Sequence, residues 1–253
     1  MKLKDRVAVV TGGSSGIGAA SAIAFAAEGA RVLVVDVDDA GAKRTVEQIE
    51  KAGGKAVAVR ADVTRAADNQ ATVERATALW GRLDIFFANA GVPQWKTSVE
   101  DVEEETFDKI MAVNVKGVFL GAKYAMPVMK RQRRGVFLVT ASTAALRPRP
   151  GGQVYAASKG AVVTLTKGLA LDAAPFGVRV VAIAPVATFT PMLPTFMNKV
   201  EVDEEGLRQY IATVPLGRLN QPEDLARTAV FLASDDAAMI TGACLEVDGG
   251  RCI

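Results

Sequence analysis

The side chains best suited to proton chemistry are Tyr155 and Lys159, which lie four residues apart in the segment Tyr-Ala-Ala-Ser-Lys. On a helix this spacing places both side chains on one face. An ammonium beside a phenol favours the phenolate, so we expect the pKa of Tyr155 to fall from about 10 toward neutral pH, where the tyrosine can exchange a proton with an alcohol. A packed aromatic beside a surface lysine has the same spacing, so the pair needs support from its surroundings.

Ser142 supplies part of that support, because it follows the apolar run Val136–Thr140. Open α/β proteins bind their ligands at the carboxyl edge of the sheet, where such a strand ends. The sequence has no histidine, which excludes Ser-His-Asp and Cys-His nucleophiles and every histidine-containing metal site. Its two cysteines, Cys244 and Cys252, are too few for a zinc cluster or a disulfide framework. We expect free thiols and no metal.

The composition favours a soluble globular protein over a nucleic-acid-binding or membrane protein. The 253 residues are 50% hydrophobic and 23% charged, with a net charge of only +2. The basic run Lys130–Arg134 is interpreted as a solvated helix end, where cations suit the negative pole of the helix. The N-terminus has no apolar run long enough for a signal peptide or a membrane span, which favours a cytoplasmic protein.

Short apolar runs alternate with helical patterns along the whole chain, and no linker or repeat divides it. We predict one α/β domain over residues 1–253, a Rossmann-type doubly wound parallel sheet of seven strands flanked by helices. The expected strands are Val7–Thr11, Val32–Val35, Ala56–Arg60, Ile85–Ala88, Val136–Thr140, Val178–Ala184 and Cys244–Val247. The expected helices include Ile17–Glu28, Ala40–Ala52, Asn69–Trp80 and Val154–Ala174. The long segment 186–215 is expected to form a lid over the substrate.

A glycine-rich turn joins the first expected strand to the first expected helix. A dinucleotide pyrophosphate needs bare backbone and the N–H groups of a helix start, and glycines permit that close approach. An ordinary strand-to-helix turn is the alternative, but the position favours a cofactor site. The residues expected to bind the cofactor here are Gly12, Ser14, Ser15, Gly16, Ile17 and Gly18.

Asp36 closes the second expected strand, where a carboxylate can accept hydrogen bonds from both ribose hydroxyls of adenosine. A 2′-phosphate would be repelled there, and no Lys or Arg occupies positions 12–18 or position 37 to offset the repulsion. The sequence therefore predicts NAD rather than NADP. A solvated residue at a strand end is the alternative interpretation of Asp36.

In this order of motifs the sequence resembles the classical short-chain dehydrogenase/reductase family over essentially its whole length. The matching positions are Thr11–Gly12, Gly16–Gly18, Asp62–Val63, Asn89–Gly91, Asn114–Val115, Ser142, Tyr155, Lys159, Pro185, Thr190 and Leu245–Gly250. The resemblance implies a sheet with the strand order 3-2-1-4-5-6-7 and a homotetramer or dimer. It also implies hydride transfer between a nicotinamide and a carbinol carbon.

The resemblance also implies a role for each matching residue. Tyr155 would be the general acid/base, Lys159 would lower its pKa and hold the nicotinamide ribose, and Ser142 would hydrogen-bond the substrate oxygen. Asn114 would position a water in the proton relay. The further cofactor contacts implied are Asp62 and Val63 at adenine, Asn89, Ala90 and Gly91 on the adenosine side, and Pro185, Thr188 and Thr190 near the carboxamide.

Two positions depart from the family pattern. The family often has two asparagines before Ala-Gly, whereas Ala88 precedes a single Asn89 here. The glycine that usually follows the proline at the sixth strand is Val186, whose branched side chain narrows the space beside the nicotinamide.

The expected pocket is mostly apolar, which suggests a medium-sized, uncharged secondary alcohol or ketone, apolar or cyclic. The candidate substrate residues are Gln94, Trp95, Gln153, Val186, Phe189 and Phe196. Packing of the lid or of a subunit interface would explain the apolar members equally well. The sequence does not decide whether Arg147 and Arg149 border the pocket. A 3-oxoacyl-thioester reductase and a non-catalytic NAD-binding scaffold remain as alternative functions.

Overall fold

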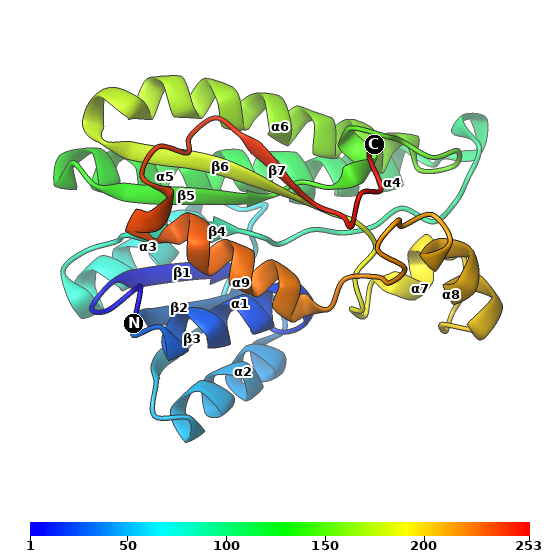
Figure 1. Ribbon diagram of the computed structural model, residues 1–253. Helices are drawn as coiled ribbons and strands as arrows, with labels where there is room; N and C mark the ends of the chain where they lie inside the picture. Colours follow the sequence, from blue (N-terminus) through cyan, green and yellow to red (C-terminus); the bar gives the residue numbers. More distant parts are fainter.

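The computed structural model describes residues 1–253, and a single parallel sheet runs through its centre (Figure 1). The strand order is β3-β2-β1-β4-β5-β6-β7, which confirms the predicted doubly wound α/β sheet. The strands are β1 (Val7–Thr11), β2 (Arg31–Asp36), β3 (Lys55–Arg60), β4 (Ile85–Ala88), β5 (Gly135–Thr140), β6 (Val178–Pro185) and β7 (Cys244–Val247). Each predicted strand end lies within one residue of the observed one.

Helices cover both faces of the sheet, because its central strands β1, β4 and β5 are buried at every residue. Neighbouring residues of one strand therefore pack in different layers. Phe86 stacks on Phe137 with ring centroids 5.1 Å apart, while Phe87 meets Phe25 of α1 at 6.4 Å. One face carries α1 (Gly16–Ala27), α2 (Asp39–Lys51) and α9 (Pro222–Ala233), and the other carries α3 (Ala66–Trp80), α5 (Gly117–Gln132) and α6 (Gln153–Ala173).

Several helices had not been assigned from the sequence. Helix α5 contains Pro127 and a run of small residues, which blur its helical pattern. It follows α4 (Glu104–Met111) through a π-helical turn at Ala112–Lys116, a type of irregularity that often marks functional sites. Helix α9 begins at a proline and has a capping box between Gln221 and Asp224, a start signal that could have been recognised.

The expected lid segment contains two short helices, α7 (Leu193–Phe196) and α8 (Glu204–Ile211), which lie beyond the carboxyl edge of the sheet (Figure 1). They pack around a small core of their own, separate from the two large clusters beside the sheet. The buried members of this core are Val186, Leu193, Met197, Val214 and Leu219. No helix is long and apolar enough to cross a membrane.

Candidate active site

A cavity of about 1000 Å³ lies at the carboxyl edge of the sheet and reaches from the glycine turn to the lid. It lies beside β1, where the strand order reverses between β2 and β4. In open parallel sheets, connections leave this switch point in opposite directions and open a crevice for a ligand. The sheet topology therefore places the glycine turn, Asp36 and the Tyr155–Lys159 pair around one cavity.

The glycine turn has the backbone shape that a phosphate cradle needs. Gly12 and Gly16 have φ values of 67° and 53°, a region that other residues rarely adopt. A Cβ on Gly12 would lie 2.9 Å from Ala90 Cα, and one on Gly16 would lie 2.9 Å from Thr190 Cγ2. Gly18 is behind the turn, where a Cβ would be 2.0 Å from the Gly12 carbonyl oxygen. Gly12, Ser14, Ser15, Gly16 and Ile17 line the cavity, whereas Gly18 lets the turn close.

The Asp36 carboxylate is held at the cavity wall by backbone N–H groups. It accepts hydrogen bonds from Ser14 N and Asp38 N, both at 3.0 Å. No Lys or Arg forms an ion pair with it, and the nearby Arg44 pairs with Asp38 instead. Asp62 and Val63 line the same end of the cavity, and Asp62 accepts from both the N–H and the hydroxyl of Thr64.

Asn89 joins three strand ends beneath the cavity. Its amide Nδ2 donates to the carbonyls of Thr11 and Gly12 at 3.1 and 3.3 Å, and its Oδ1 accepts from the Thr140 hydroxyl at 2.9 Å. Asn89, Ala90 and Gly91 all line the cavity. The single asparagine thus satisfies both ends of its amide, while Ala88 packs in the core.

Tyr155, Lys159 and Ser142 meet at one wall of the cavity. Lys159 Nζ donates to the Thr140 carbonyl at 2.7 Å and lies 5.8 Å from the centre of the Tyr155 ring. Burial raises the pKa of Tyr155 to about 12, and a hydrogen bond with Ser142 only partly opposes this. Burial also lowers the pKa of Lys159 to about 8. The predicted fall in the tyrosine pKa is therefore not seen, because burial disfavours the phenolate more than its neighbours stabilise it.

Asn114 is completely buried in the π-helical turn, and its side chain does not line the cavity. Its Oδ1 accepts from Val92 N at 2.8 Å, and its Nδ2 donates to the Val92 carbonyl at 3.0 Å and to the Ser158 hydroxyl at 3.1 Å. The side chain thus connects the loop after β4 to α6. A water-positioning role would have to use a group other than this amide.

The six candidate substrate residues divide into two groups. Gln94, Val186 and Phe196 line the cavity, whereas Trp95, Gln153 and Phe189 do not. Trp95 is exposed, Gln153 donates to the Thr97 carbonyl, and Phe189 packs beside the lid core. The Phe196 ring meets Tyr155 edge-on at 5.2 Å between centroids.

Two of these positions, Gln94 and Val186, are fixed by local contacts. Gln94 is buried, and its Oε1 accepts from Tyr155 N at 2.9 Å. Val186 is buried in the lid core without a positive φ, so glycine is not required there. Pro185, Thr188 and Thr190 line the cavity as well, with the Thr188 hydroxyl bonded to the Val186 carbonyl at 2.8 Å.

Comparison with known proteins identifies the family. A family model described as "Enoyl-(Acyl carrier protein) reductase" matches residues 12–251. The 4-formylbenzenesulfonate dehydrogenase TsaC1/TsaC2 of Comamonas testosteroni is 43% identical, with 99% of each chain covered. The chain belongs to the short-chain dehydrogenase/reductase family. As a member of that family, it is an oxidoreductase that uses a nicotinamide cofactor.

Two further relatives extend the comparison within the short-chain dehydrogenase/reductase family. A 2,5-dichloro-2,5-cyclohexadiene-1,4-diol dehydrogenase, LinX of Sphingobium indicum, is 37% identical over 98% of this chain and 97% of its own. A crystal structure of a 3-ketoacyl-(acyl-carrier-protein) reductase from Brucella melitensis, complexed with NADH, superimposes with a TM-score of 0.92. That protein is 45% identical, with 99% of this chain and 100% of that chain covered.

The cavity of this short-chain dehydrogenase/reductase also contains arginines whose place the sequence left open. Arg147 and Arg149, in the loop between Ser142 and Tyr155, line the cavity together with Arg251 from the tail after β7. Arg251 lies 104 residues beyond Arg147, whose guanidinium donates to the Arg251 carbonyl at 3.0 Å. The basic loop was visible in the sequence, but no local signal indicates that the tail joins it.

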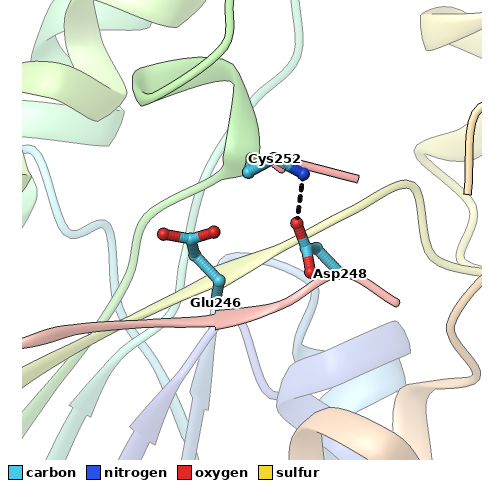
Figure 2. Close-up of side chains that lie close together, drawn as sticks. All are labelled: Glu246, Asp248 and Cys252. Carbon is cyan, nitrogen blue, oxygen red and sulfur yellow. Dashed lines mark hydrogen bonds between the residues drawn. The ribbon is translucent and has the colours of Figure 1, made fainter. Parts of the chain in front are cut away.

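Asp248 shapes the tail that carries Arg251 (Figure 2). Its carboxylate accepts from Gly250 N at 2.9 Å and from Cys252 N at 2.7 Å. Glu246, Asp248 and Cys252 bring possible metal-binding atoms within 4.8 Å of one another. Burial, followed by the hydrogen bond with Asp248, raises the pKa of the Cys252 thiol to about 11. The two backbone N–H groups held by Asp248 make this cluster a brace for the tail.

Proposed function

We propose that this chain is an NAD-dependent dehydrogenase that interconverts a secondary alcohol and a ketone. The observation that carries the proposal is the meeting of Ser142, Tyr155 and Lys159 on a cavity that also contains the glycine turn and Asp36. The first three residues can bind and protonate a reacting oxygen, and the other two elements fit a dinucleotide.

The preference for NAD rests on Asp36. Its carboxylate is fixed at the wall, can accept hydrogen bonds from ribose hydroxyls, and has no basic ion-pair partner. A 2′-phosphate at that place would meet a negative charge with nothing beside it to neutralise the repulsion. The glycine turn fits a pyrophosphate, because Gly12 and Gly16 line the cavity without side chains at the start of α1.

Ketone reduction suits the protonation state of the buried groups. With a pKa of about 12, Tyr155 holds its proton at neutral pH and can donate it from Oη to the oxygen of the reacting carbonyl. Ser142 hydrogen-bonds the same oxygen and lowers the tyrosine pKa. A bound nicotinamide supplies or accepts the hydride. In the oxidation direction Tyr155 must first lose its proton, and the Lys159 ammonium favours that loss when a bound ligand brings the two groups together.

The proposed substrate is medium-sized and cyclic. Val186 and Phe196 give the cavity an apolar surface near Tyr155. Two relatives, a formylbenzenesulfonate dehydrogenase and a cyclohexadienediol dehydrogenase, are named after compounds with a six-membered carbon ring. The Brucella structure's name favours the alternative, reduction of a 3-oxoacyl thioester, which would use the same three groups.

Further parts of the proposal concern the whole molecule. Residues 1–253 act as one domain, and 186–215 close over the substrate as a lid that contacts Tyr155 through Phe196. A homotetramer or dimer is supported by the exposed apolar side chains Phe107, Phe119 and Leu171 on α4, α5 and α6. Two unpaired cysteines suit a reducing cytoplasm. Light scattering of the purified protein measures the assembly, and cell fractionation measures the location.

The function is tested with a panel of cyclic and linear secondary alcohols and ketones, together with acetoacetyl-CoA, following nicotinamide absorbance. We expect turnover of a cyclic substrate with NAD that is lost in Tyr155→Phe. Selective turnover of the thioester would favour the alternative reductase. A protein that binds NADH, turns over nothing and is unaffected by Tyr155→Phe would be a scaffold instead.

A further inference from the structure

The cavity wall includes three arginine side chains, Arg147, Arg149 and Arg251, none of which forms an ion pair with an Asp or Glu side chain. The ion pairs within 4.0 Å include none of the three. They come from the loop after β5 and the tail after β7, whereas the glycine turn and Asp36 follow β1 and β2. The arginines and the expected pyrophosphate site therefore come from different strand ends of the sheet.

Each guanidinium has donors left over. Arg147 donates to the Arg251 and Ile253 carbonyls at 3.0 and 2.8 Å. Arg149 donates to the Thr213 hydroxyl at 2.7 Å, and its guanidinium carbon lies 4.7 Å from the Tyr210 ring centre. Arg251 lines the cavity, and its side chain makes no hydrogen bond with the protein. A guanidinium has five N–H donors, so most of them remain free to bind a ligand.

The three cations lie close enough to repel one another. Burial lowers the pKa of Arg251, Arg149 and Arg147 lower it further, and the smaller opposing effect of Asp248 does not offset them. The tail is nevertheless fixed in this position, because the Asp248 carboxylate accepts hydrogen bonds from Gly250 N and Cys252 N. Figure 2 shows the bond from Cys252. Like charges that the fold holds close together repel one another, and a bound anion relieves that repulsion.

A chain of contacts leads from this cluster to the reacting groups. Arg149 lies over the Tyr210 ring, the Tyr210 hydroxyl donates to the Phe196 carbonyl, and the Phe196 ring contacts Tyr155. The apolar lid surface thus lies between the proton donor and the arginines. A ligand that bridges the two needs a polar oxygen at one end, an apolar body and a negative charge at the other.

We propose that the substrate carries a carboxylate or another oxyanion, which Arg149 and Arg251 bind while the carbinol carbon lies at Ser142 and Tyr155. This inference rests on the proposed function and names its substrate class. It replaces the uncharged molecule expected from the sequence with a cyclic one that has a single charged end. Guanidiniums bind carboxylates through paired, charge-assisted hydrogen bonds, so the cluster would contribute selectivity as well as affinity.

The test compares two ketones of matched shape, 4-oxocyclohexanecarboxylate and its neutral carboxamide, with NADH as reductant. Arg251→Gln removes a charge without breaking a protein hydrogen bond of that side chain. We expect wild-type kcat/KM to favour the carboxylate about 10-fold or more, and Arg251→Gln to remove that preference mainly through KM. The carboxamide should change less than about twofold, and Arg251→Lys should keep part of the preference. Arg208→Gln, on the outer surface of α8, is the matched control and should change neither ketone.

Equal kcat/KM for the two ketones, or a preference that survives Arg251→Gln, would overturn this proposal. Turnover of the carboxamide that is lost in Tyr155→Phe would leave the proposed function intact in that case. If neither ketone is turned over, their dissociation constants are measured by calorimetry in the presence of NADH. Wild type should then bind the carboxylate more tightly than the carboxamide, and Arg251→Gln should lose this difference. The binding of acetoacetyl-CoA to wild type and to Arg251→Gln is compared as well. If its binding alone depends on Arg251, the anion belongs to a thioester carrier and the cyclic substrate is wrong.

Discussion

The two ends of the cavity have opposite charges and are built in different ways. At the end beside β2 and β3, Asp36 accepts hydrogen bonds from backbone N–H groups of the nearby turn. At the end beside β5 and β7, Arg149 and Arg251 come from segments about a hundred residues apart. The acidic end therefore needs only the pairing of β1 with β2, whereas the basic end needs the tail after β7 to meet the loop after β5. The proposed function assigns the cofactor to the acidic end and the substrate to the basic end of this one cavity.

The largest effect should come from removing the proton donor between the two ends. Tyr155→Phe keeps the ring that packs on Phe196 but loses the hydroxyl. Because positioned proton transfer contributes about 100- to 10,000-fold, we expect kcat to fall by about 1000-fold. The NADH dissociation constant, measured by fluorescence titration, should change less than about threefold. Activity within tenfold of wild type would exclude Tyr155 as the main donor.

Moving positive charge to the acidic end should reverse the cofactor preference. Asp36→Ala combined with Val37→Arg removes a carboxylate and adds a cation at the cavity wall. We expect the ratio of kcat/KM for NADH to that for NADPH to fall by about 100-fold, equal to about 2.7 kcal/mol of differential binding. Asp39→Ala, on the surface of α2, is the control and should leave the ratio unchanged. A ratio that is insensitive to Asp36 would remove the basis for the NAD assignment.

The buried Lys159 should lower stability while it serves catalysis. Its folded pKa of about 8 lies below the ordinary lysine value of 10.5, so the folded state resists the charged form. Lys159→Met should raise the free energy of unfolding at pH 7 by roughly 1–3 kcal/mol while abolishing turnover. The unfolded wild type binds more protons between pH 8 and 10.5, so wild-type stability rises over that window and the gain from the substitution shrinks.

Denaturant unfolding at pH 7, 8.5 and 10 measures this effect. Lys167→Met is the matched control, because Lys167 lies on the same helix but is exposed. It should change stability by less than about 0.5 kcal/mol at each pH. A Lys159→Met protein that is less stable than wild type at pH 7 would show that the Thr140 hydrogen bond outweighs the cost of burial.

The smallest effect is expected from Gln94, which positions Tyr155 through the backbone. Gln94→Leu removes the acceptor for Tyr155 N but also removes an Nε2 that has no hydrogen-bond partner. The two changes partly offset each other in stability, whereas only the first alters the position of Tyr155. We expect a 3- to 10-fold fall in kcat, roughly 1 kcal/mol, with little change in melting temperature. A fall in melting temperature without a change in kcat would assign Gln94 a structural role only.

Features encoded in short segments were predicted well from the sequence. The central strands β1, β4 and β5 are continuous apolar runs because helices cover both sheet faces, and the ends of all seven strands could be placed within one residue. The glycine turn and Asp36 line the cavity as expected from their position after β1 and β2. Gly18 was predicted to bind the cofactor, but it lies behind the turn. There it packs against Gly12 so closely that no side chain would fit.

Features that depend on distant contacts were predicted less well. Trp95 and Phe189 share an apolar character with Phe196, yet only Phe196 turns toward the cavity. The expected tyrosine pKa shift ignored complete burial, which cannot be read from a four-residue spacing. The arginine cluster depends on the tail folding back over the loop after β5, and no sequence period signals that contact.

The most direct test of the central claim is a set of initial rates for one cyclic ketone with NADH and with NADPH, in wild type and in Tyr155→Phe. The account predicts that wild type is faster with NADH by at least tenfold in kcat/KM and that Tyr155→Phe is inactive with both cofactors. A preference for NADPH would contradict the role given to Asp36. Turnover that survives in Tyr155→Phe would contradict the chemistry proposed for the cavity.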